Sequence, residues 1–427
     1  MLEAAANRAL PAIVIGFFAA ATITLAATPI VRRYAIRFGM VDRPEARRVN
    51  ERTIARGGGV AILLGFVIVA AALIVLNSFV GLHFVDRPQI VKRPQILALL
   101  GGAIVAVAIG LLDDWLQLRA RWQFIGQFLL AGGAVVLGVA VTTVNDPLTA
   151  DGTLAVPGII GLVATVLWIV GMINSVNFID GLDGLSSGIA MIAALTLGVI
   201  SLTADPVEPY VAMFCFALAG ALFGFLRWNF HPASIFAGTS GIMLVGYSLA
   251  VLSILGAAKV AVAALVLGVP IMDTFWIIVR RTAAGRSPFS ADRGHIHHRL
   301  LDMGLSHRGT VLVIYGVCIV LAAMSLGLSG RGLSYAFMGL VVVFGLALFL
   351  IERLGGGAGA IEESLDASSY ANGPDGEGDA TADATDGATN GATNGATSGA
   401  TNGATSGAAA ETASSADATA PAPDRPA

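Results

Sequence analysis

The sequence predicts an all-α membrane protein with about eleven transmembrane helices. Hydrophobic residues make up 56% of the 427 residues and charged residues only 12%, which is not the composition of a soluble domain. Apolar stretches of about 20 residues, the length that crosses a bilayer, occur eleven times along the chain. Backbone polar groups find no water in lipid, so each stretch must form a helix.

Short polar segments separate the eleven candidate spans. Their centres lie near Phe18, Phe66, Val105, Gly132, Leu167, Ala193, Ala217, Tyr247, Leu267, Ile319 and Val343. The first stretch could be a signal peptide. However, it is long, lacks a good basic segment before it and is followed by a basic loop, so we interpret it as a retained helix.

The distribution of basic residues orients these helices. With the N-terminus outside, 19 of the 25 Lys and Arg residues lie on the cytoplasmic side, as the positive-inside rule requires. We therefore expect a multi-pass protein of the cell membrane (inner or plasma membrane) with its C-terminus in the cytoplasm. The same orientation places Asp113, Asn177, Asp183 and His297 together on the cytoplasmic face.

The composition changes at about Gly355, where Gly, Ala, Thr, Ser, Asn and Asp begin to dominate in repeated Ala-Thr-Asn-Gly and Ala-Thr-Ser-Gly units. Such a segment cannot bury enough apolar surface to fold. We expect a transmembrane domain over 1–354 and a disordered cytoplasmic tail over 355–427. The net charge of −3 is too small to indicate nucleic-acid binding.

Adjacent carboxylates, Asp113 and Asp114, end the third span. Such a pair can bind Mg²⁺ or accept a proton, because a like-charged neighbour raises the pKa of one member. A helix end that simply reaches water is the alternative. Arg119 and Arg121 follow closely and favour function, since a phosphate substrate needs both signs of charge.

Amides and carboxylates recur every three residues at the end of the fifth span. They are Asn174, Asn177, Asp180 and Asp183. Spacing of three places successive members on nearly one helix face, and polar groups so near hydrocarbon are costly enough to indicate a function. The two glycines that follow would let a ligand approach the backbone closely. A polar turn between spans is the alternative.

The segment 280–308 is basic and rich in histidine. His295, His297 and His298 could suggest zinc, but no cysteine lies nearby and no His-x₃-His pair is present. We interpret the segment as a clamp for a diphosphate, in which Arg293 and the histidines donate hydrogen bonds to phosphate oxygens. A positive-inside loop or a patch for anionic lipid is the alternative.

Two further features carry weaker signals. Asp273 lies inside the span before the basic segment, and we interpret it as a helix–helix hydrogen-bonding group, with catalysis as the alternative. Gly57, Gly58 and Gly59 open the second span. A helix start of this kind can bind phosphate through its backbone N–H groups.

Together these motifs resemble the polyprenyl-phosphate N-acetylhexosamine-1-phosphate transferase family over about residues 30 to 350. The resemblance is carried by Leu112-Asp113-Asp114, by Asn174-x-x-Asn177-x-x-Asp180-Gly181-x-Asp183-Gly184, by Asn229 to Gly238, and by Ser287 to Leu300. The last motif is more similar to the GlcNAc-type branch than to the MurNAc-pentapeptide branch.

The resemblance implies transfer of an N-acetylhexosamine 1-phosphate, with GlcNAc expected, from a UDP-sugar to undecaprenyl phosphate in the membrane lipid. UMP is released, Mg²⁺ is required, and the product starts a cell-envelope glycan such as lipopolysaccharide or teichoic acid. A homodimer is left open. By position, Asp113 and Asp114 would act at the acceptor phosphate, Asn177 would bind metal, Asp183 would face the uracil, Asn174 and Asp180 would bind substrate, and Arg293, His295, His297 and His298 would hold the sugar and diphosphate.

Three positions depart from the family pattern. Thr239 stands where a metal-binding aspartate is expected, Gln123 where a lysine is expected, and Asn50 where a histidine is expected. Loss of an anion and a cation together could keep the charge balanced. It could equally mark a non-catalytic homologue that binds UDP-sugar or lipid carrier as a regulator or scaffold. We favour an active transferase, because other carboxylates remain for Mg²⁺. A secondary transporter is disfavoured, since no repeated half is evident.

Overall fold

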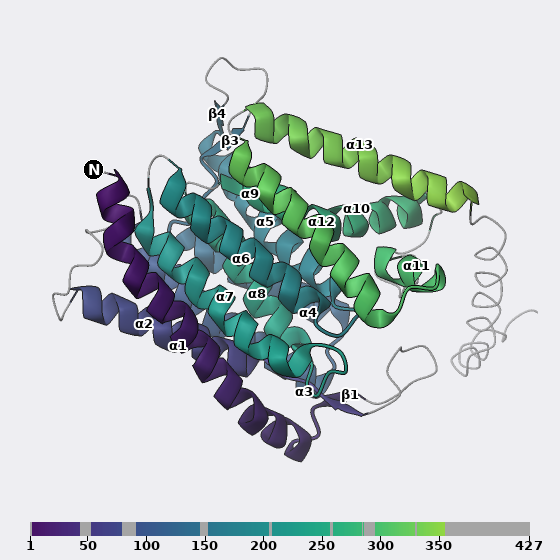
Figure 1. Ribbon diagram of the computed structural model, residues 1–427, viewed down its shortest axis with the longest axis horizontal. Coiled ribbons are helices and arrows are strands. Elements are labelled where there is room, and N and C mark those ends of the chain that lie inside the picture. Colours follow the sequence, from purple (N-terminus) through teal and green to yellow (C-terminus); the bar gives the residue numbers. More distant parts are fainter. Residues whose placement is uncertain are drawn as a thin grey trace, which may run out of the picture. The chain divides into compact units, whose positions relative to one another are not determined.

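The computed structural model describes residues 2–42, 53–78, 91–145, 153–204, 207–256, 259–283, 285, 295–328 and 331–354. These residues form helices joined by short segments, with two small antiparallel hairpins (Figure 1). The elements are α1 (Leu2–Arg37), β1 (Val41–Asp42), β2 (Ile54–Ala55), α2 (Gly59–Ser78), α3 (Arg93–Leu116), α4 (Ala120–Val136), β3 (Thr143–Asn145), β4 (Thr153–Ala155), α5 (Gly158–Ile179), α6 (Leu185–Thr203), α7 (Pro209–Asn229), α8 (Gly238–Leu255), α9 (Lys259–Val266), α10 (Gly268–Ala283), α11 (Ile296–Asp302), α12 (His307–Gly327) and α13 (Arg331–Leu354). The predicted tail over 355–427 lies outside the described residues.

Eight of the described helices are long and apolar enough to cross a membrane, so the all-helical, polytopic architecture is confirmed. They are α1 from Arg8, α2, α3, α5, α6, α7, α8 and α12. A ninth span is formed if α9 and α10 count as one, although the chain bends there by 80°. The expected number of eleven is not reached by these criteria, because α4 has only 17 residues and α13 is counted only over Arg331–Leu346, the part whose side chains are described.

The bend between α9 and α10 has a local cause. Pro270 has no backbone N–H and cannot continue the hydrogen-bond ladder of a helix. Gly268 lies just before it, and a methyl group added there would sit 2.2 Å from the Leu340 side chain. Proline therefore ends the regular helix, and Gly268 leaves room for the Leu340 side chain beside the bend.

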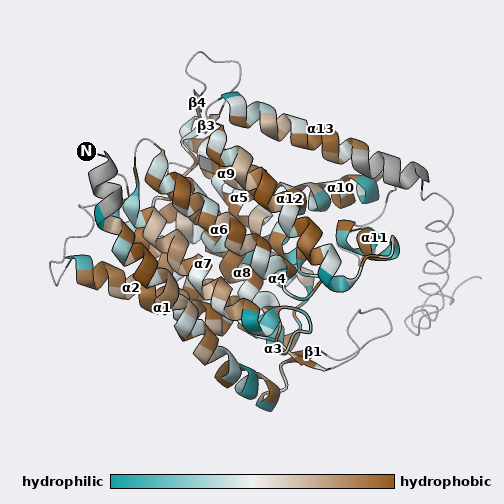
Figure 2. Cartoon of the chain, in the orientation of Figure 1, coloured by the Kyte–Doolittle hydropathy of each residue, from teal (hydrophilic) through white to brown (hydrophobic). Residues whose placement is uncertain are grey.

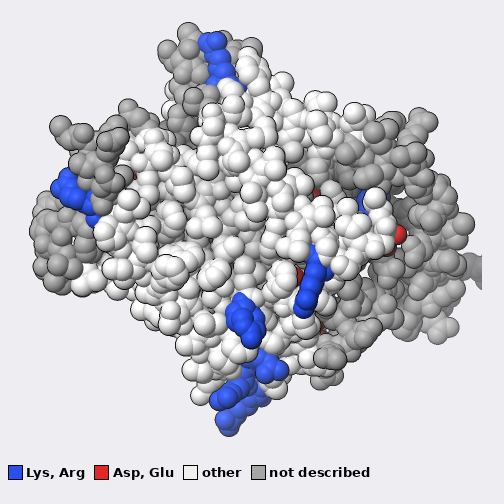
Figure 3. Space-filling view, in the orientation of Figure 1, with Lys and Arg blue, Asp and Glu red and all other residues white. Residues whose placement is uncertain are grey.

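The core lies in α6, α7 and α8. In these helices 78%, 78% and 89% of the apolar window is buried, against 39% in α1. The surrounding helices present apolar side chains outward, such as Leu129 at 71% and Ile159 at 77% exposure. Figure 2 shows hydrophobic residues along the helices, and Figure 3 shows a broad face free of charged side chains, with Lys and Arg towards its margins. This pattern fits helices surrounded by lipid.

Small residues bring the central helices into backbone contact. A methyl group added to Gly220 or Gly224 of α7 would lie within 2.2 Å of the carbonyl oxygens of Phe17 or Ala21 in α1. Gly110 of α3 approaches the backbone of Ser240 in α8 equally closely. Such contacts are typical of helices that pack in membranes. They also place the end of α3 against the start of α8.

The segments predicted to share one face do meet at one end of the bundle. The β1–β2 hairpin joins the segment before α8 through a bridge between Ala55 and Ile235. Nearby, Arg32 donates to the carbonyl oxygen of Ser234 at 2.9 Å, and Arg308 donates to that of His231 at 2.9 Å. The loops after α1, α3, α5 and α7 thus form one polar end.

Candidate active site

Asp114 on the last turn of α3 binds the start of α8. Its Oδ1 accepts a hydrogen bond from the backbone N–H of Thr239 at 2.8 Å. Its Oδ2 accepts from the N–H and the hydroxyl of Ser240, at 3.1 and 2.8 Å. Gly238 has a φ of +70°, and a methyl group there would lie 2.5 Å from Asp114 Oδ2. A 4% exposed carboxylate therefore caps a helix that begins in another part of the sequence.

Asp113 at the end of α3 accepts hydrogen bonds from the loop that follows, from α4 and from α8. Its Oδ1 accepts from the N–H of Leu118 at 3.0 Å and from Nε2 of Gln123 at 2.7 Å. Its Oδ2 accepts from the Thr239 hydroxyl at 2.5 Å. Gln117 adopts a left-handed conformation with φ of 50° and turns the chain from α3 towards α4. Every oxygen of the aspartate pair thus already accepts a hydrogen bond.

The four polar groups of 174–183 do not share one face, which corrects the expectation drawn from their spacing. Asn174 donates to Oε1 of Gln127 on α4 at 2.6 Å. Asn177 is exposed, and its side chain makes no hydrogen bond to the described residues. Helix α5 ends at Ile179, so Asp180 and Asp183 follow a turn, in which Gly184 has a φ of +80°.

Asp180 lies among several charges at the centre of the site. The pKa of Asp180 is raised to about 7, mainly by burial and also by the nearby Asp114 and Asp183, while the Ser186 hydroxyl and Arg56 act in the opposite direction. The Ser186 hydroxyl donates to Oδ1 of Asp180. Its second carboxylate oxygen has no hydrogen bond among the described residues. Arg56 was missed as a site residue by the sequence analysis, which counted it only towards the orientation.

Asp183 is bound by two histidines that the motif analysis did not select. His231 Nδ1 lies 2.8 Å from Asp183 Oδ2, which also accepts from the N–H of Ala233 at 3.0 Å. The backbone N–H of Asp183 donates to Nε2 of His307 at 2.9 Å, and the two imidazole rings stack with centroids 4.2 Å apart. The position of His231 inside the motif from Asn229 to Gly238 was the available signal.

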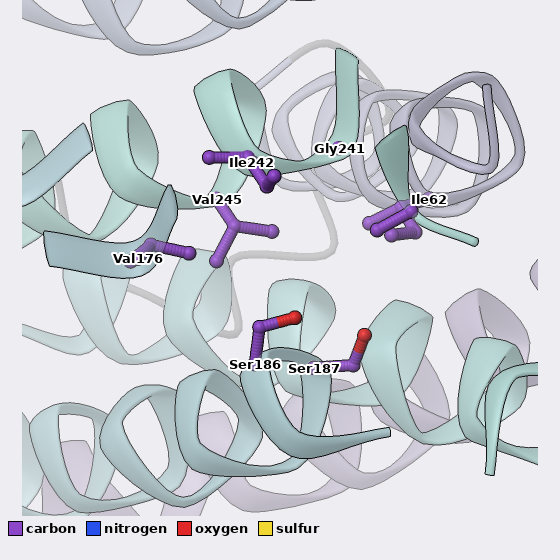
Figure 4. Close-up of a pocket in the computed structure, with 8 residues that line it drawn as sticks. Ile62, Val176, Ser186, Ser187, Gly241, Ile242 and Val245 are labelled. Carbon is purple, nitrogen blue, oxygen red and sulfur yellow. The ribbon is translucent and has the colours of Figure 1, made fainter. Parts of the chain in front are cut away.

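A small recess adjoins these groups, because Ser186, which binds Asp180, lines it (Figure 4). It lies between α2, α5, α6 and α8 and has a volume of only about 10 Å³. Val176, Ile242 and Val245 face it from one side, and the hydroxyls of Ser186 and Ser187 lie across from them. Ser187 donates to Oδ1 of Asn229 at 2.9 Å, and Asn229 donates to the carbonyl oxygen of Ile235 at 3.1 Å. The serines therefore connect the recess to the polar residues above it.

The histidines form a stacked ladder that begins at Asp273. His295 Nδ1 lies 2.7 Å from Asp273 Oδ2, and the rings of His295 and His297 stack with centroids 5.4 Å apart. His298 follows, with its centroid 4.4 Å from that of His297. Asp273 on α10 therefore bonds to the start of helix α11, where His295 is the cap and Ile296 the first residue, and this is a helix–helix contact as we expected. Arg293, the fourth predicted member of this clamp, lies outside the described residues, and so does Asn50.

His297 is an interior residue. Its side chain is 1% exposed, and its Nδ1 has no hydrogen-bond partner among the described residues. A methyl group added to Gly181 would lie 2.2 Å from Nε2 of His297. Burial lowers the pKa of His297 to about 2, and the neighbouring histidines add to the effect. The ring is therefore neutral and packs against the turn that follows α5.

The glycines before α2 do not offer a phosphate site through their amides, so that expectation is wrong. The N–H groups of Gly58 and Gly59 donate to the carbonyl oxygens of Phe236 and Ala237, each at 3.0 Å. A methyl group on Gly58 would lie 2.4 Å from the ring of Phe225. Close packing explains these two glycines.

The oxygen donors fit Mg²⁺ better at Asp180 than at Asp113. Two groups of described residues have metal-ligand spacing, namely Asp183, His231 and His307, and Asp273, His295 and His297. Each has two imidazoles, whereas Mg²⁺ prefers oxygen ligands, and each carboxylate already binds an imidazole. Within the described part of the site, the unbonded oxygen of Asp180 and the exposed amide oxygen of Asn177 are two oxygen donors of the kind that Mg²⁺ prefers.

Comparison with known proteins gives a consistent family. The profile of Glycosyl transferase family 4 matches residues 96–257. A Bacillus subtilis protein named "Probable undecaprenyl-phosphate N-acetylglucosaminyl 1-phosphate transferase" is 36% identical over 353 residues, which cover 79% of this chain and 90% of the relative. A "Decaprenyl-phosphate N-acetylglucosaminephosphotransferase" of Mycolicibacterium smegmatis is 35% identical over 370 residues, covering 81% and 89%.

A more distant relative has the same kind of name. The "Undecaprenyl-phosphate alpha-N-acetylglucosaminyl 1-phosphate transferase" of Yersinia pestis is 26% identical over 337 residues, covering 76% of this chain and 85% of the relative. The matched segments cover most of this chain and most of each of these proteins. It therefore belongs to glycosyl transferase family 4, the family of the polyprenyl-phosphate N-acetylglucosamine-1-phosphate transferases.

Proposed function

We propose that this protein transfers N-acetylhexosamine 1-phosphate, with GlcNAc the preferred sugar, from a UDP-sugar to undecaprenyl phosphate and releases UMP. The observation that carries the proposal is the meeting of Asp114, Asp180, Asp183 and Arg56 at the end of apolar helices. A lipid acceptor can reach such a site from the bilayer, and a nucleotide donor can reach it from water. The names of the relatives support this substrate class.

The reaction is a displacement at phosphorus. An oxygen of the acceptor phosphate forms a bond to the β-phosphorus of the UDP-sugar. The bond from that phosphorus to the bridging oxygen breaks, and UMP leaves with the electron pair. Positioning and charge neutralisation supply most of the catalysis of such a step. Arg56 is the described cation that acts on both Asp114 and Asp180, and we assign it to the diphosphate.

In this reaction the predicted aspartates and asparagines have roles that fit their surroundings. Asn177 and Asp180 would hold Mg²⁺, which neutralises the diphosphate when bound. Asp113 and Asp114 would fix the starts of α4 and α8 beside the acceptor phosphate. Asp183 would set the loop around His231, where the uracil is expected. Asn174 would act from behind, through Gln127.

Membrane orientation is part of the proposal. The polar end contains the loops to which the positive-inside rule assigns most of the Lys and Arg residues, so we place the site on the cytoplasmic side of the cell membrane. UDP-sugars are made in the cytoplasm, which suits this placement. The product would then be the first lipid-linked intermediate of a cell-envelope glycan.

A second function is favoured by one observation. Thr239 and Gln123 both donate to Asp113, so neutral partners replace charged ones beside the acceptor site. A protein that binds UDP-sugar or lipid carrier without turnover would tolerate this change.

One experiment separates the two functions. Purified protein is incubated with undecaprenyl phosphate, Mg²⁺ and a panel of UDP-sugars, and UMP and lipid product are measured beside the affinity for each UDP-sugar. Turnover with a UDP-N-acetylhexosamine supports the transferase. Binding without UMP release, under conditions where a known relative turns over, supports the non-catalytic homologue.

A further inference from the structure

Asp273 is a buried carboxylate whose two oxygens both bind the start of the histidine segment. The side chain is 1% exposed. Its Oδ2 lies 2.7 Å from Nδ1 of His295, and its Oδ1 accepts from the N–H of Ile296 at 3.0 Å. A carboxylate at such depth beside lipid is costly unless both oxygens are satisfied. Both are satisfied here, by His295 and Ile296 at the start of α11.

The contact fixes which nitrogen of His295 carries the proton. A carboxylate oxygen only accepts hydrogen bonds, so Nδ1 must be the donor, and Nε2 is left without that proton in the neutral ring. A carboxylate behind an imidazole sets the ring's tautomer and orientation in many sites. His295 therefore presents one defined nitrogen on the side away from Asp273.

The ring of His295 also contacts the segment that contains the proposed metal ligands. It stacks on Phe178, with centroids 5.8 Å apart, and Phe178 directly follows Asn177. On its other side His295 stacks on His297, which packs against Gly181. One carboxylate on α10 thus holds a ladder of rings against the residues on either side of Asp180.

We propose that Asp273 is a positioning residue of the transfer reaction, which fixes the tautomer of His295 so that Nε2 of this ring accepts a hydrogen bond from a hydroxyl or amide N–H group of the UDP-sugar donor. The inference rests on the proposed function. The catalytic contact belongs to His295, and Asp273 acts through it. The helix–helix hydrogen bond expected of Asp273 thus has a specific partner, His295 at the start of α11.

Asp273→Asn is the central variant, because it keeps the shape and the acceptor for Ile296 but presents an amide donor to His295. The ring must then accept at Nδ1 and carry its proton on Nε2. We expect kcat to fall roughly 10- to 100-fold, the usual effect of losing such a partner. Thr274→Ala is the matched control, since Thr274 is the next residue, is 8% exposed and has a hydroxyl without a partner among the described residues.

His295→Asn tests whether the two residues act as a unit. Its amide can still donate to Asp273, but Nε2 is lost. The double variant Asp273→Asn with His295→Asn should be no slower than the slower single variant, as expected for coupled residues. Independent losses that multiply would overturn the proposal.

The protonation of His295 gives a readout that does not need turnover. Nitrogen-15 spectra of histidine-labelled protein should show Nδ1–H at His295 in the wild type and in Thr274→Ala, and Nε2–H in Asp273→Asn. The affinity for UDP-GlcNAc should fall only in Asp273→Asn. If the wild type releases no UMP but these shifts occur, the transferase assignment fails while the positioning role stands. An unchanged tautomer, or losses equal to those of Thr274→Ala, would overturn the role of Asp273.

Discussion

Two aspartates at the same end of the helix bundle have opposite kinds of partner. Asp113 accepts hydrogen bonds from the neutral side chains of Gln123 and Thr239, whereas Asp273 binds an imidazole. Both described departures from the family pattern contact Asp113. The partner of Asp273, in contrast, belongs to the histidine motif that resembles the GlcNAc-type branch. The described positions that depart from the expected pattern thus lie at one carboxylate, and the histidine motif lies at the other.

Thr239 and Gln123 are chemically linked, because both bind the carboxylate of Asp113. The Thr239 hydroxyl lies 2.5 Å from Asp113 Oδ2, so an aspartate at 239 would bring a second carboxylate close to the first. Two carboxylates at that separation need a cation between them or beside them. A lysine at 123 would supply one. With threonine and glutamine in these places, the carboxylate of Asp113 is satisfied without a cation.

The largest effect is expected at Asn177, outside both regions. Asn177→Ala should lower turnover by two orders of magnitude or more, because it removes an oxygen donor for the metal and diphosphate. The melting temperature in detergent should stay the same, since Asn177 is exposed and has no described partner. Asn174→Ala is the matched control and should mainly lower stability, because Asn174 binds Gln127. Near-normal turnover in Asn177→Ala would show that its assigned role is wrong.

Asp114→Asn tests whether the aspartate pair is structural as well as functional. An amide in place of the carboxylate would face one of the N–H groups of Thr239 or Ser240 with its own N–H. Leaving a buried donor unpaired costs about 1 to 3 kcal/mol, so both stability and turnover should fall. Chemical or thermal unfolding with parallel assays measures the two. A loss of turnover with unchanged stability would contradict the capping role.

Thr239→Asp and Gln123→Lys form a cycle that tests the coupling directly. Thr239→Asp alone should destabilise the protein through repulsion with Asp113, and adding Gln123→Lys should restore most of the loss. In an active enzyme Thr239→Asp should also tighten apparent Mg²⁺ binding, because a carboxylate attracts the ion more than a hydroxyl does. Additive effects on stability would show that residues 123 and 239 are not coupled through Asp113. An unchanged Mg²⁺ dependence would show that residue 239 does not lie beside the metal.

The smallest effect concerns pH and stability at Asp180. The native pKa of about 7 lies above the ordinary 3.8, so between these values the native state binds more protons than the unfolded state. Stability therefore falls as the pH rises through this window. Asp180→Asn should remove the loss and melt a few degrees higher than wild type above pH 7, with little gain near pH 4. A gain that is independent of pH would contradict the raised pKa.

Hydropathy and charge, which are local properties of the chain, were enough to predict the helical membrane architecture. The same properties located the polar clusters, because an apolar stretch of fixed length must end at an interface. Asp113, Asn177, Asp183 and His297 were predicted to lie together on one face. The structure places Asp114 and Asp183 near Asp180, and His297 against Gly181, so these clusters meet at the turn after α5. The predicted number of eleven spans is not confirmed, because α4 has only 17 residues and the chain bends by 80° between α9 and α10.

Only the tertiary structure decided which partner each polar group has. Asp183 bonds to His231 and His307, which are 48 and 124 residues away, and Asp113 reaches Thr239 across 126 residues. Such pairs depend on which helix ends become neighbours, and glycine contacts such as Gly110 against Ser240 set that. The sequence by itself determined that costly polar groups meet at a membrane boundary. Packing decided which of them hold the scaffold and which remain open to a ligand, because a hydrogen bond requires two groups within about 3 Å of each other.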